Sequence, residues 1–400
     1  MDSTPEQPLA SSVPASSIPE PPVPDPATLP PAHTVFYGPF GLRAGWSLLI
    51  YFAIIATLGL GIYLIGHQIH TQREHVAAIS AAKTGKPAAP LAPLAPKSDP
   101  NAPAPLAGAI FGEIILFAVF FLLSLLMAYI EHRKLSAFGL GSGPSGGPSG
   151  ARSLNRALIG AIWGIIAISL LVGALHIFHF LTFDSLLDHG PKILLWGGIQ
   201  LFFFFLVGLT EEYLFRGYVQ FTLTRGMVSI GNLISPQHAR AIAFWIASVL
   251  TSALFLYAHT SNGGETPLGL FQVFLAGVVF VVALWRTGSL WWGIGFHMAW
   301  DWGQSFLYGV PDSGGLIQGR LFATHASGNP LYSGGTTGPE GSILCIPILL
   351  LVITVLFFTH SSPQPSLELP SSTLPPHPES SALPPLSDIS PLSDISPSLA

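Results

Sequence analysis

Residues 193–217 read ILLWGGIQLFFFFLVGLTEEYLFRG, an apolar run that passes into two glutamates and an arginine without a strong turn signal. This run predicts a membrane-embedded helix that continues through Glu211, Glu212 and Arg216. A charged group at membrane depth costs from about 2.5 to more than about 10 kcal/mol. Glu212 and Arg216 are four residues apart and can neutralise each other on one helix face. Glu211 has no such local partner, which favours a functional site over a purely structural ion pair.

The composition of the whole chain also indicates a membrane protein. Half of its 400 residues are apolar and only 9% are charged, whereas soluble domains carry about 25% charged residues. The net charge of −5 at pH 7 provides no basic surface, so we expect no nucleic-acid partner. The single cysteine, Cys345, lies in an apolar run, which excludes a disulfide framework and a thiolate metal site.

Eight apolar segments approach the roughly 20 residues that a helix needs to cross a bilayer. They are residues 46–66, 110–130, 157–183, 193–222, 241–258, 268–284, 290–308 and 343–358. We therefore predict an all-α fold, a polytopic membrane helix bundle of about eight transmembrane helices. The lipid bilayer is its first expected partner.

Proline, serine and alanine dominate the two ends of the chain and one linker. Such segments cannot bury a core, so we expect disordered tails at 1–34 and 361–400. Residues 35–107 would contain the first transmembrane helix and an Ala/Pro-rich linker. Residues 108–360 would form the membrane core, which is the part of the chain expected to carry the functional site.

Basic residues in the connections predict the orientation. Several flank the connections that would lie on one side: Arg133, Lys134, Arg152, Arg156, Arg225, Arg240 and Arg286. We therefore expect a multi-pass protein of the cell membrane with both tails cytoplasmic. The first connection, which carries Arg73 and Lys83, disagrees with this orientation.

Three more titratable residues lie on or beside apolar segments. His259 closes the segment 241–258, and His297 and Asp301 stand four residues apart in the segment 290–308. The latter two share a helix face, so the carboxylate can fix the tautomer of the imidazole.

A helix rise of 1.5 Å per residue allows a rough depth for each group. Counted from the nearest basic residue, Glu211 would lie about 21 Å deep, His297 about 16 Å and His259 about 28 Å. The three depths differ, but a common site is feasible.

These residue types suit hydrolysis of an amide. A carboxylate helped by an imidazole can deprotonate a water, and a second polar group can stabilise the oxyanion. Alternatively, Glu211, His259 and His297 could bind Zn²⁺, with the other glutamate as general base. The HExxH spacing of zinc proteases does not occur among these residues. Residue types alone leave both mechanisms open.

Three motifs occur in a fixed order across three apolar segments: Glu211-Glu212-x-x-x-Arg216, Phe255-x-x-x-His259 and His297-x-x-x-Asp301. Their combination resembles the CAAX-processing and bacteriocin-processing endopeptidase family (CPBP, or Abi), which consists of intramembrane proteases. The likeness extends over about residues 115–308.

The resemblance implies a role for each matching position. Glu211 would activate the attacking water together with His259, and His297 and Asp301 would bind or polarise the scissile carbonyl. Glu212 and Arg216 would support the site electrostatically. The last position is more often Asn in this family. An ionised Asp301 cannot donate a hydrogen bond, so it is protonated, orients His297 or binds a metal.

The resemblance predicts an integral-membrane endopeptidase that cuts a membrane-associated or lipid-modified peptide or protein, as in CAAX processing. Two other functions stay open. One is a non-catalytic membrane scaffold or bacteriocin-immunity protein. The other is an ion or proton transporter, against which we find no inverted repeat between the two halves of the chain.

Overall fold

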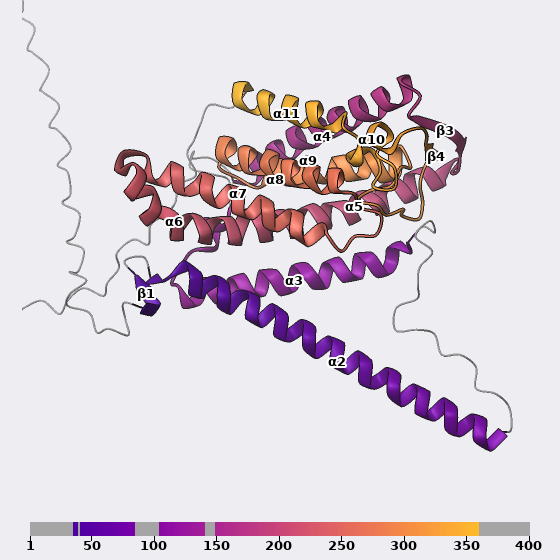
Figure 1. Cartoon of the computed structure of the whole chain (residues 1–400), viewed down its shortest axis with the longest axis horizontal. Helices are drawn as coiled ribbons and strands as arrows, with labels where there is room; N and C mark the ends of the chain where they lie inside the picture. Colours follow the sequence, from indigo (N-terminus) through magenta and orange to yellow (C-terminus); the bar gives the residue numbers. More distant parts are fainter. Residues whose placement is uncertain (1–34, 39–40, 85–103, 141–148, 360–400) are drawn as a thin grey trace, which may run out of the picture.

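The computed structural model describes residues 35–38, 41–84, 104–140 and 149–359. They form a bundle of long helices with two small sheets at its ends (Figure 1). The elements are β1 (Tyr37–Gly38), β2 (Gly41–Leu42), α2 (Ala44–Thr84), α3 (Leu106–Ile130), α4 (Ser149–Ile177), β3 (Leu181–Leu186), α5 (Pro191–Glu212), α6 (Gln220–Ile234), α7 (Ala239–His259), α8 (Pro267–Thr287), α9 (Trp291–Trp302), β4 (Phe322–Ala326), α10 (Pro330–Ser333) and α11 (Cys345–Thr359).

Short helices of other types complete the part of the chain that the structure describes. Two are π-helices: η3 (Tyr213–Val219) continues α5, and η5 (Gly303–Leu307) continues α9. Three are 3₁₀-helices: η2 (Leu135–Phe138), η4 (Pro236–His238) and η6 (Pro339–Gly341).

Every predicted apolar segment contains a helix, which confirms the polytopic helical bundle. Among the described residues, six helices are long and apolar enough to cross a membrane, and α11 is shorter. The predicted segment 157–183 ends early, at Ile177, because His179 adopts a positive φ of 62° and residues 181–186 form β3. The first helix extends to Thr84, well past the predicted end at residue 66.

The predicted tails and most of the predicted linker, at residues 85–103, lie outside the described residues. The prediction of disorder for these segments therefore stays a prediction. The same holds for the division of the chain into four parts.

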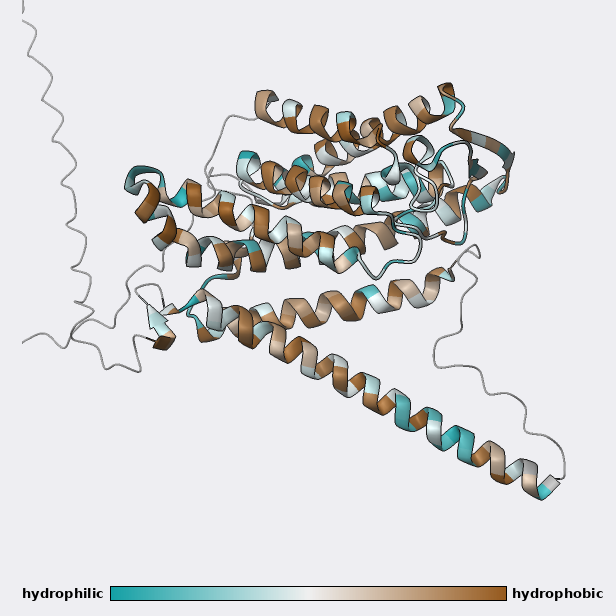
Figure 2. Ribbon diagram, viewed as in Figure 1, coloured by the Kyte–Doolittle hydropathy of each residue, from teal (hydrophilic) through white to brown (hydrophobic). Residues whose placement is uncertain are grey.

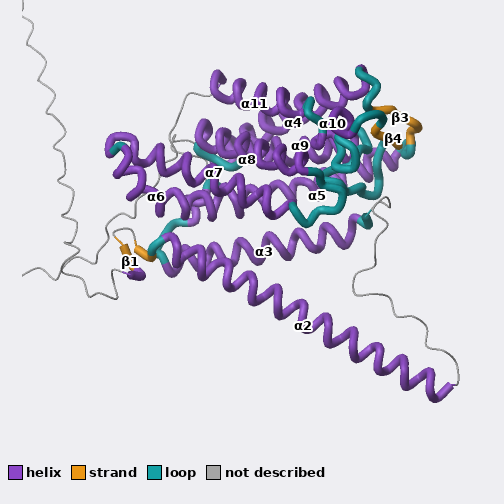
Figure 3. The backbone as a smooth tube through the Cα atoms, in the orientation of Figure 1, coloured by secondary structure: helices purple, strands orange, loops and turns teal. Residues whose placement is uncertain are grey.

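Within the described ranges, the strands are the one departure from an all-α fold. β3 pairs with β4 in antiparallel register, with Leu181 opposite Ala326. These strands and the longest loops gather at one end of the bundle, next to α10 (Figure 3). Backbone groups of segments that are not helical must find partners, and pairing between the two strands satisfies them.

The opposite end of the bundle holds the turns between α6 and α7 and between α8 and α9 (Figure 1). There α8 ends at Gly288, whose φ of 64° is a conformation that glycine adopts at low cost. The amide of Leu290 donates to the carbonyl of Gly139, which fastens this turn to the segment after α3. The basic connections predicted to be cytoplasmic belong to this end.

Helix α2 leaves the bundle. Its 41 residues would span about 60 Å at 1.5 Å per residue, twice the hydrocarbon thickness of a bilayer. Figure 2 shows that the part near the bundle is hydrophobic and that most hydrophilic residues lie farther out. The first part contacts α3 and α6, so the outer part projects beyond the bundle.

Helix α9 lies at the centre of the bundle, packed against α4, α5 and α8. It approaches α4 closely because both helices carry glycines at the contact, a common device in membrane bundles. A Cβ atom built on Gly160 would overlap the carbonyl oxygen of Trp292, and one on Gly295 would overlap that of Ala157. This packing determines where α9 holds its polar side chains.

Replacing Gly160 with alanine should therefore destabilise the protein by about 1–3 kcal/mol, the usual cost of overpacking. Thermal unfolding in detergent micelles measures the effect. Gly173 lies on the same helix with no atom within 4 Å of a built Cβ, so Gly173→Ala is the matched control and should be neutral or slightly stabilising. Equal unfolding temperatures for both variants would contradict the packing argument.

Candidate active site

Four of the six predicted site residues line one cavity. Glu211 at the end of α5, His259 at the end of α7, and His297 and Asp301 on α9 all border a cavity of about 230 Å³. The structure thus brings together groups that lie up to 90 positions apart in the sequence. Glu212 and Arg216 lie directly behind this wall and contact the same histidine or each other.

His297 is the centre of the polar contacts. Its Nε2 atom lies 3.7 Å from Oε2 of Glu211 and 3.4 Å from Oδ2 of Asp301. Its Nδ1 atom lies 3.4 Å from Oε1 of Glu212, without the alignment of a hydrogen bond. Three carboxylates therefore surround this ring, which can donate from both nitrogens only when it carries two protons.

Glu211 differs from the other carboxylates in contact with His297 by its exposure. Its side chain is 27% exposed, against 9% for Asp301 and 1% for Glu212. A base that removes a proton from water must be reachable by water. This difference favours Glu211 over Glu212 as the base.

Glu212 and Arg216 form the buried ion pair that their spacing predicts, with Nη1 and Oε1 2.9 Å apart. The guanidinium carbon also lies 4.1 Å from the ring centroid of Phe255 and 4.8 Å from that of Phe280. These rings stabilise the cation where its remaining nitrogens have no hydrogen-bond partner. The pair thus holds Glu212 against His297 from behind.

His259 packs against Phe255, with ring centroids 4.6 Å apart, as the family resemblance implies. Its Nδ1 atom lies 2.8 Å from the carbonyl oxygen of Phe255. Because that oxygen only accepts, Nδ1 carries the hydrogen and Nε2 of a neutral ring is left as an acceptor. His259 can therefore take a proton from water or a substrate.

A π-helix follows each acidic motif. η3 begins directly after Glu212, and η5 begins two residues after Asp301. A π-helical turn holds an extra residue, changes the direction of the side chains that follow and often occurs at functional sites. No sequence signal that we recognised predicted either one.

Counting residues along the sequence placed Glu211 and His259 at different depths because it treated Arg225 as the end of the helix that carries Glu211. Helix α6 continues past Arg225 to Ile234, and Arg225 is buried, 3.2 Å from Glu131. Counted from the α6–α7 turn, Glu211 and His259 lie at similar depths of roughly 34 and 30 Å. His297 has a shorter count because the α6–α7 turn extends beyond the α8–α9 turn (Figure 1).

Sequence reasoning missed three acidic residues near the site. Glu113 on α3 interacts electrostatically with Glu211 and His297. A single carboxylate in an apolar helix indicates a functional residue, so Glu113 could have been predicted from the sequence. Asp312 and Glu340 lie in the connection between α9 and α11 and line the cavity. Nothing in their sequence surroundings distinguishes them from ordinary loop residues.

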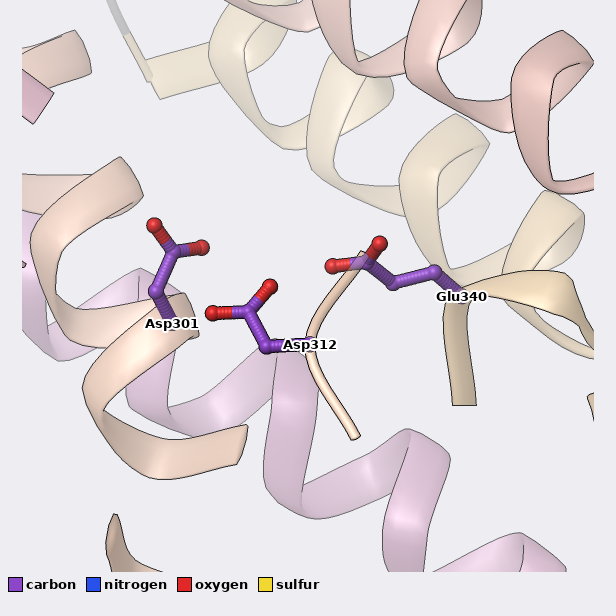
Figure 4. Close-up of side chains that lie close together, drawn as sticks. All are labelled: Asp301, Asp312 and Glu340. Carbon is purple, nitrogen blue, oxygen red and sulfur yellow. The ribbon is translucent and has the colours of Figure 1, made fainter. Parts of the chain in front are cut away.

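The predicted zinc ligands are only partly gathered. Glu211 and His297 are 3.7 Å apart, a separation that suits two ligands of one zinc ion with bonds of about 2 Å. The group of ligand atoms that lie within 4.8 Å of one another, in the part of the chain that the structure describes, is instead Asp301, Asp312 and Glu340 (Figure 4). Zinc at Glu211, His259 and His297 therefore stays a prediction.

Glu265, between α7 and α8, has a displaced pKa. Burial, and then the charge of Glu340, raise it from 4.5 to about 7. The ionised carboxylate is therefore less favourable in the folded state than in the unfolded state. This cost is zero below about pH 4.5, grows as the pH rises, and is complete above about pH 7.

Glu265→Gln should consequently stabilise the protein at pH 8 and have little effect at pH 4. The full pKa shift corresponds to about 3 kcal/mol, and solvent screening of this half-buried group reduces it to about 1 kcal/mol. Thermal unfolding in micelles at the two pH values measures the difference, with the exposed Glu74→Gln as control. Destabilisation at pH 8 would contradict the sign of the shift.

Comparison with protein families identifies the central part of the chain. Residues 193–303 match the family described as "Type II CAAX prenyl endopeptidase Rce1-like". The comparisons with curated proteins and with solved structures found no match. All six predicted site residues fall inside the matched segment, and Asp312 and Glu340 fall outside it. Residues 193–303 of this multi-pass membrane protein are therefore similar to the Rce1-like family of type II CAAX prenyl endopeptidases.

Proposed function

We propose that this protein is an intramembrane endopeptidase that hydrolyses a peptide bond of a membrane-associated or lipid-modified peptide or protein. The position of Glu211 carries the proposal. This carboxylate is the most exposed of those in contact with His297, and it shares a cavity with His259. The family match supports peptide-bond hydrolysis as the reaction. The shared cavity supports the assignment of these residues to that reaction.

In the proposed reaction, Glu211 accepts a proton from a water molecule while the Nε2 atom of His259 holds that water. The water oxygen bonds to the carbonyl carbon of the substrate, and the carbonyl oxygen becomes an oxyanion. An N–H of His297 donates to this oxyanion. Glu211 then gives its proton to the amide nitrogen, the carbon–nitrogen bond breaks, and an acid and an amine leave.

Asp301 serves this reaction best as a positioning residue. As an anion it cannot donate to an oxyanion, whereas its contact of 3.4 Å with Nε2 of His297 lets it orient the ring. Glu212 contacts the ring at the other nitrogen. Two carboxylates on opposite sides therefore determine where the imidazole points.

The walls of the cavity favour a substrate with an apolar group. Apolar side chains from α5, α8, α9 and α11 line it beside the polar residues: Phe203, Phe204, Val273, Phe280, Phe296 and Leu349. A lipid chain or an apolar peptide segment loses contact with water in such a space, which stabilises the complex.

Purified full-length protein in detergent micelles tests the function directly. The substrates are two fluorogenic peptides with the same CAAX-type end, one prenylated and one not, and mass spectrometry identifies the bond that is cut. We expect cleavage, faster for the prenylated peptide. A folded protein that cuts neither peptide would support the scaffold or immunity alternative.

The same assay separates the two mechanisms. If Glu211 activates water directly, a zinc-selective chelator such as phenanthroline leaves the rate unchanged. If Glu211, His259 and His297 hold zinc, the chelator abolishes cleavage and added Zn²⁺ restores it. Metal analysis of the purified protein provides an independent readout.

A further inference from the structure

Three carboxylates from separate parts of the chain point toward one another beside the site (Figure 4). Asp301 comes from α9, Asp312 from the loop after η5, and Glu340 from η6. One oxygen of each lies within 4.8 Å of the others. Like charges this close and this buried repel one another strongly, so the arrangement needs a compensating cation or bound protons.

The protein itself supplies little compensation. Ser305 donates to Asp312 and Ser313 to Glu340, each over 3.3 Å, and the indole nitrogen of Trp300 donates to Glu340 over 3.4 Å. These are long hydrogen bonds from neutral donors. In the described ranges no lysine or arginine forms an ion pair with the three carboxylates. The nearby imidazoles are His297, in contact with Asp301, and His259, which interacts with Glu340.

Two buried glutamines provide an independent indication of a ligand. Gln304 is 0% exposed, its side chain forms a hydrogen bond with Glu340, and its amide nitrogen donates to the carbonyl of Pro311, next to Asp312. Gln272 is 2% exposed, lines the cavity, and donates to the carbonyl of Ser342. The Oε1 atom of each has no hydrogen-bond partner. A buried amide oxygen without a donor is costly unless a donor or a cation faces it.

We propose that Asp301, Asp312 and Glu340, with amide oxygens of Gln304 and Gln272, bind one calcium ion. Oxygen ligands alone select hard cations. Oxygens within 4.8 Å of one another fit around Ca²⁺, because two oxygens on opposite sides of this ion lie about 4.8 Å apart at bonds of about 2.4 Å. The ion offsets two of the three negative charges and ties the loop after η5 and η6 to α9.

This site is separate from the predicted zinc ligands and does not depend on the proposed hydrolysis. Asp312 and Glu340 lie outside the segment that matches the Rce1-like family. Two of its three carboxylates therefore come from the connection between α9 and α11. Only Asp301 also contacts one of the predicted zinc ligands, His297.

Terbium luminescence tests the site, because Tb³⁺ replaces Ca²⁺ and accepts energy from a nearby tryptophan. Trp300 lies against Glu340 and is the expected sensitiser. The full chain in micelles should give a saturable signal that Ca²⁺ displaces. Asp312→Asn and Glu340→Gln should each weaken Tb³⁺ binding at least tenfold. Asp184→Asn is the matched control, since Asp184 is an exposed carboxylate that pairs with His325 on the β3–β4 sheet.

Thermal unfolding gives a second readout that does not need Trp300. Added Ca²⁺ should raise the unfolding temperature of the wild type, of Asp184→Asn and of Trp300→Phe, and should leave Asp312→Asn and Glu340→Gln unchanged. Glu211→Gln should bind Tb³⁺ like the wild type, so loss of cleavage and loss of the calcium site are distinguishable.

Two results would overturn the proposal. One is Tb³⁺ binding that is unsaturable, or equal in the wild type and in the Asp312 and Glu340 variants. The other is a cluster that does not bind Ca²⁺ but binds a peptide with a lysine or arginine side chain. That result would mean that the three carboxylates bind a cationic part of the substrate.

Discussion

Glu211→Gln should abolish peptide cleavage while the protein stays folded. The substitution keeps the size and shape of the side chain but removes the group that accepts a proton from water. General base catalysis contributes about 10²- to 10⁴-fold to a rate, so the loss should be at least 100-fold. Cleavage of the prenylated peptide by purified protein in micelles measures it.

Two variants control this experiment. Glu265→Gln makes the same chemical change outside the predicted set of site residues and should keep the cleavage rate within about twofold. His259→Ala should also lose activity, because it removes the second acceptor for the water. Glu211→Gln protein that cleaves at the wild-type rate would refute the role of Glu211 as the base.

Arg216→Met should produce the largest loss of stability. Glu212 would remain as a buried charge with a side-chain exposure of 1% and without its guanidinium partner. Removing one partner of a buried ion pair costs about 3–5 kcal/mol, most of it from the charge left behind. Thermal or denaturant-induced unfolding in mixed micelles measures the change.

The double variant Glu212→Gln/Arg216→Met distinguishes the cost of an unpaired buried charge from the loss of the other contacts of Arg216. It leaves no buried charge, so it should recover much of the stability lost in Arg216→Met. Arg216→Lys should recover less, because an ammonium group lacks the flat guanidinium that lies over Phe255 and Phe280. Arg216→Met that unfolds like the wild type would show that this pair contributes little.

Much of the fold follows from local properties of the sequence. An apolar run of about 20 residues has few stable alternatives to a helix in a bilayer, so the positions of the helices were predictable. Pairs four residues apart on one helix, such as Glu212 with Arg216, were predictable for the same reason. The small sheet of β3 and β4 was not, since it joins residues more than 130 positions apart.

The candidate site was likewise predictable in part. Its six residues could be named from three short motifs, because each motif is a spacing within one helix. Their contacts could not, since those depend on how α5, α7 and α9 pack. The sequence therefore identified His297 without indicating that three carboxylates surround it.

By itself the sequence determined the membrane helices and the residue types that can perform hydrolysis, since both depend on interactions along one helix. Tertiary structure alone decided that the Glu211 side chain is 27% exposed while Glu212 is buried, and that Asp312 and Glu340 from a long connection meet Asp301. The physical reason is that exposure and clustering of charge depend on neighbours from distant parts of the chain, which local spacing does not encode.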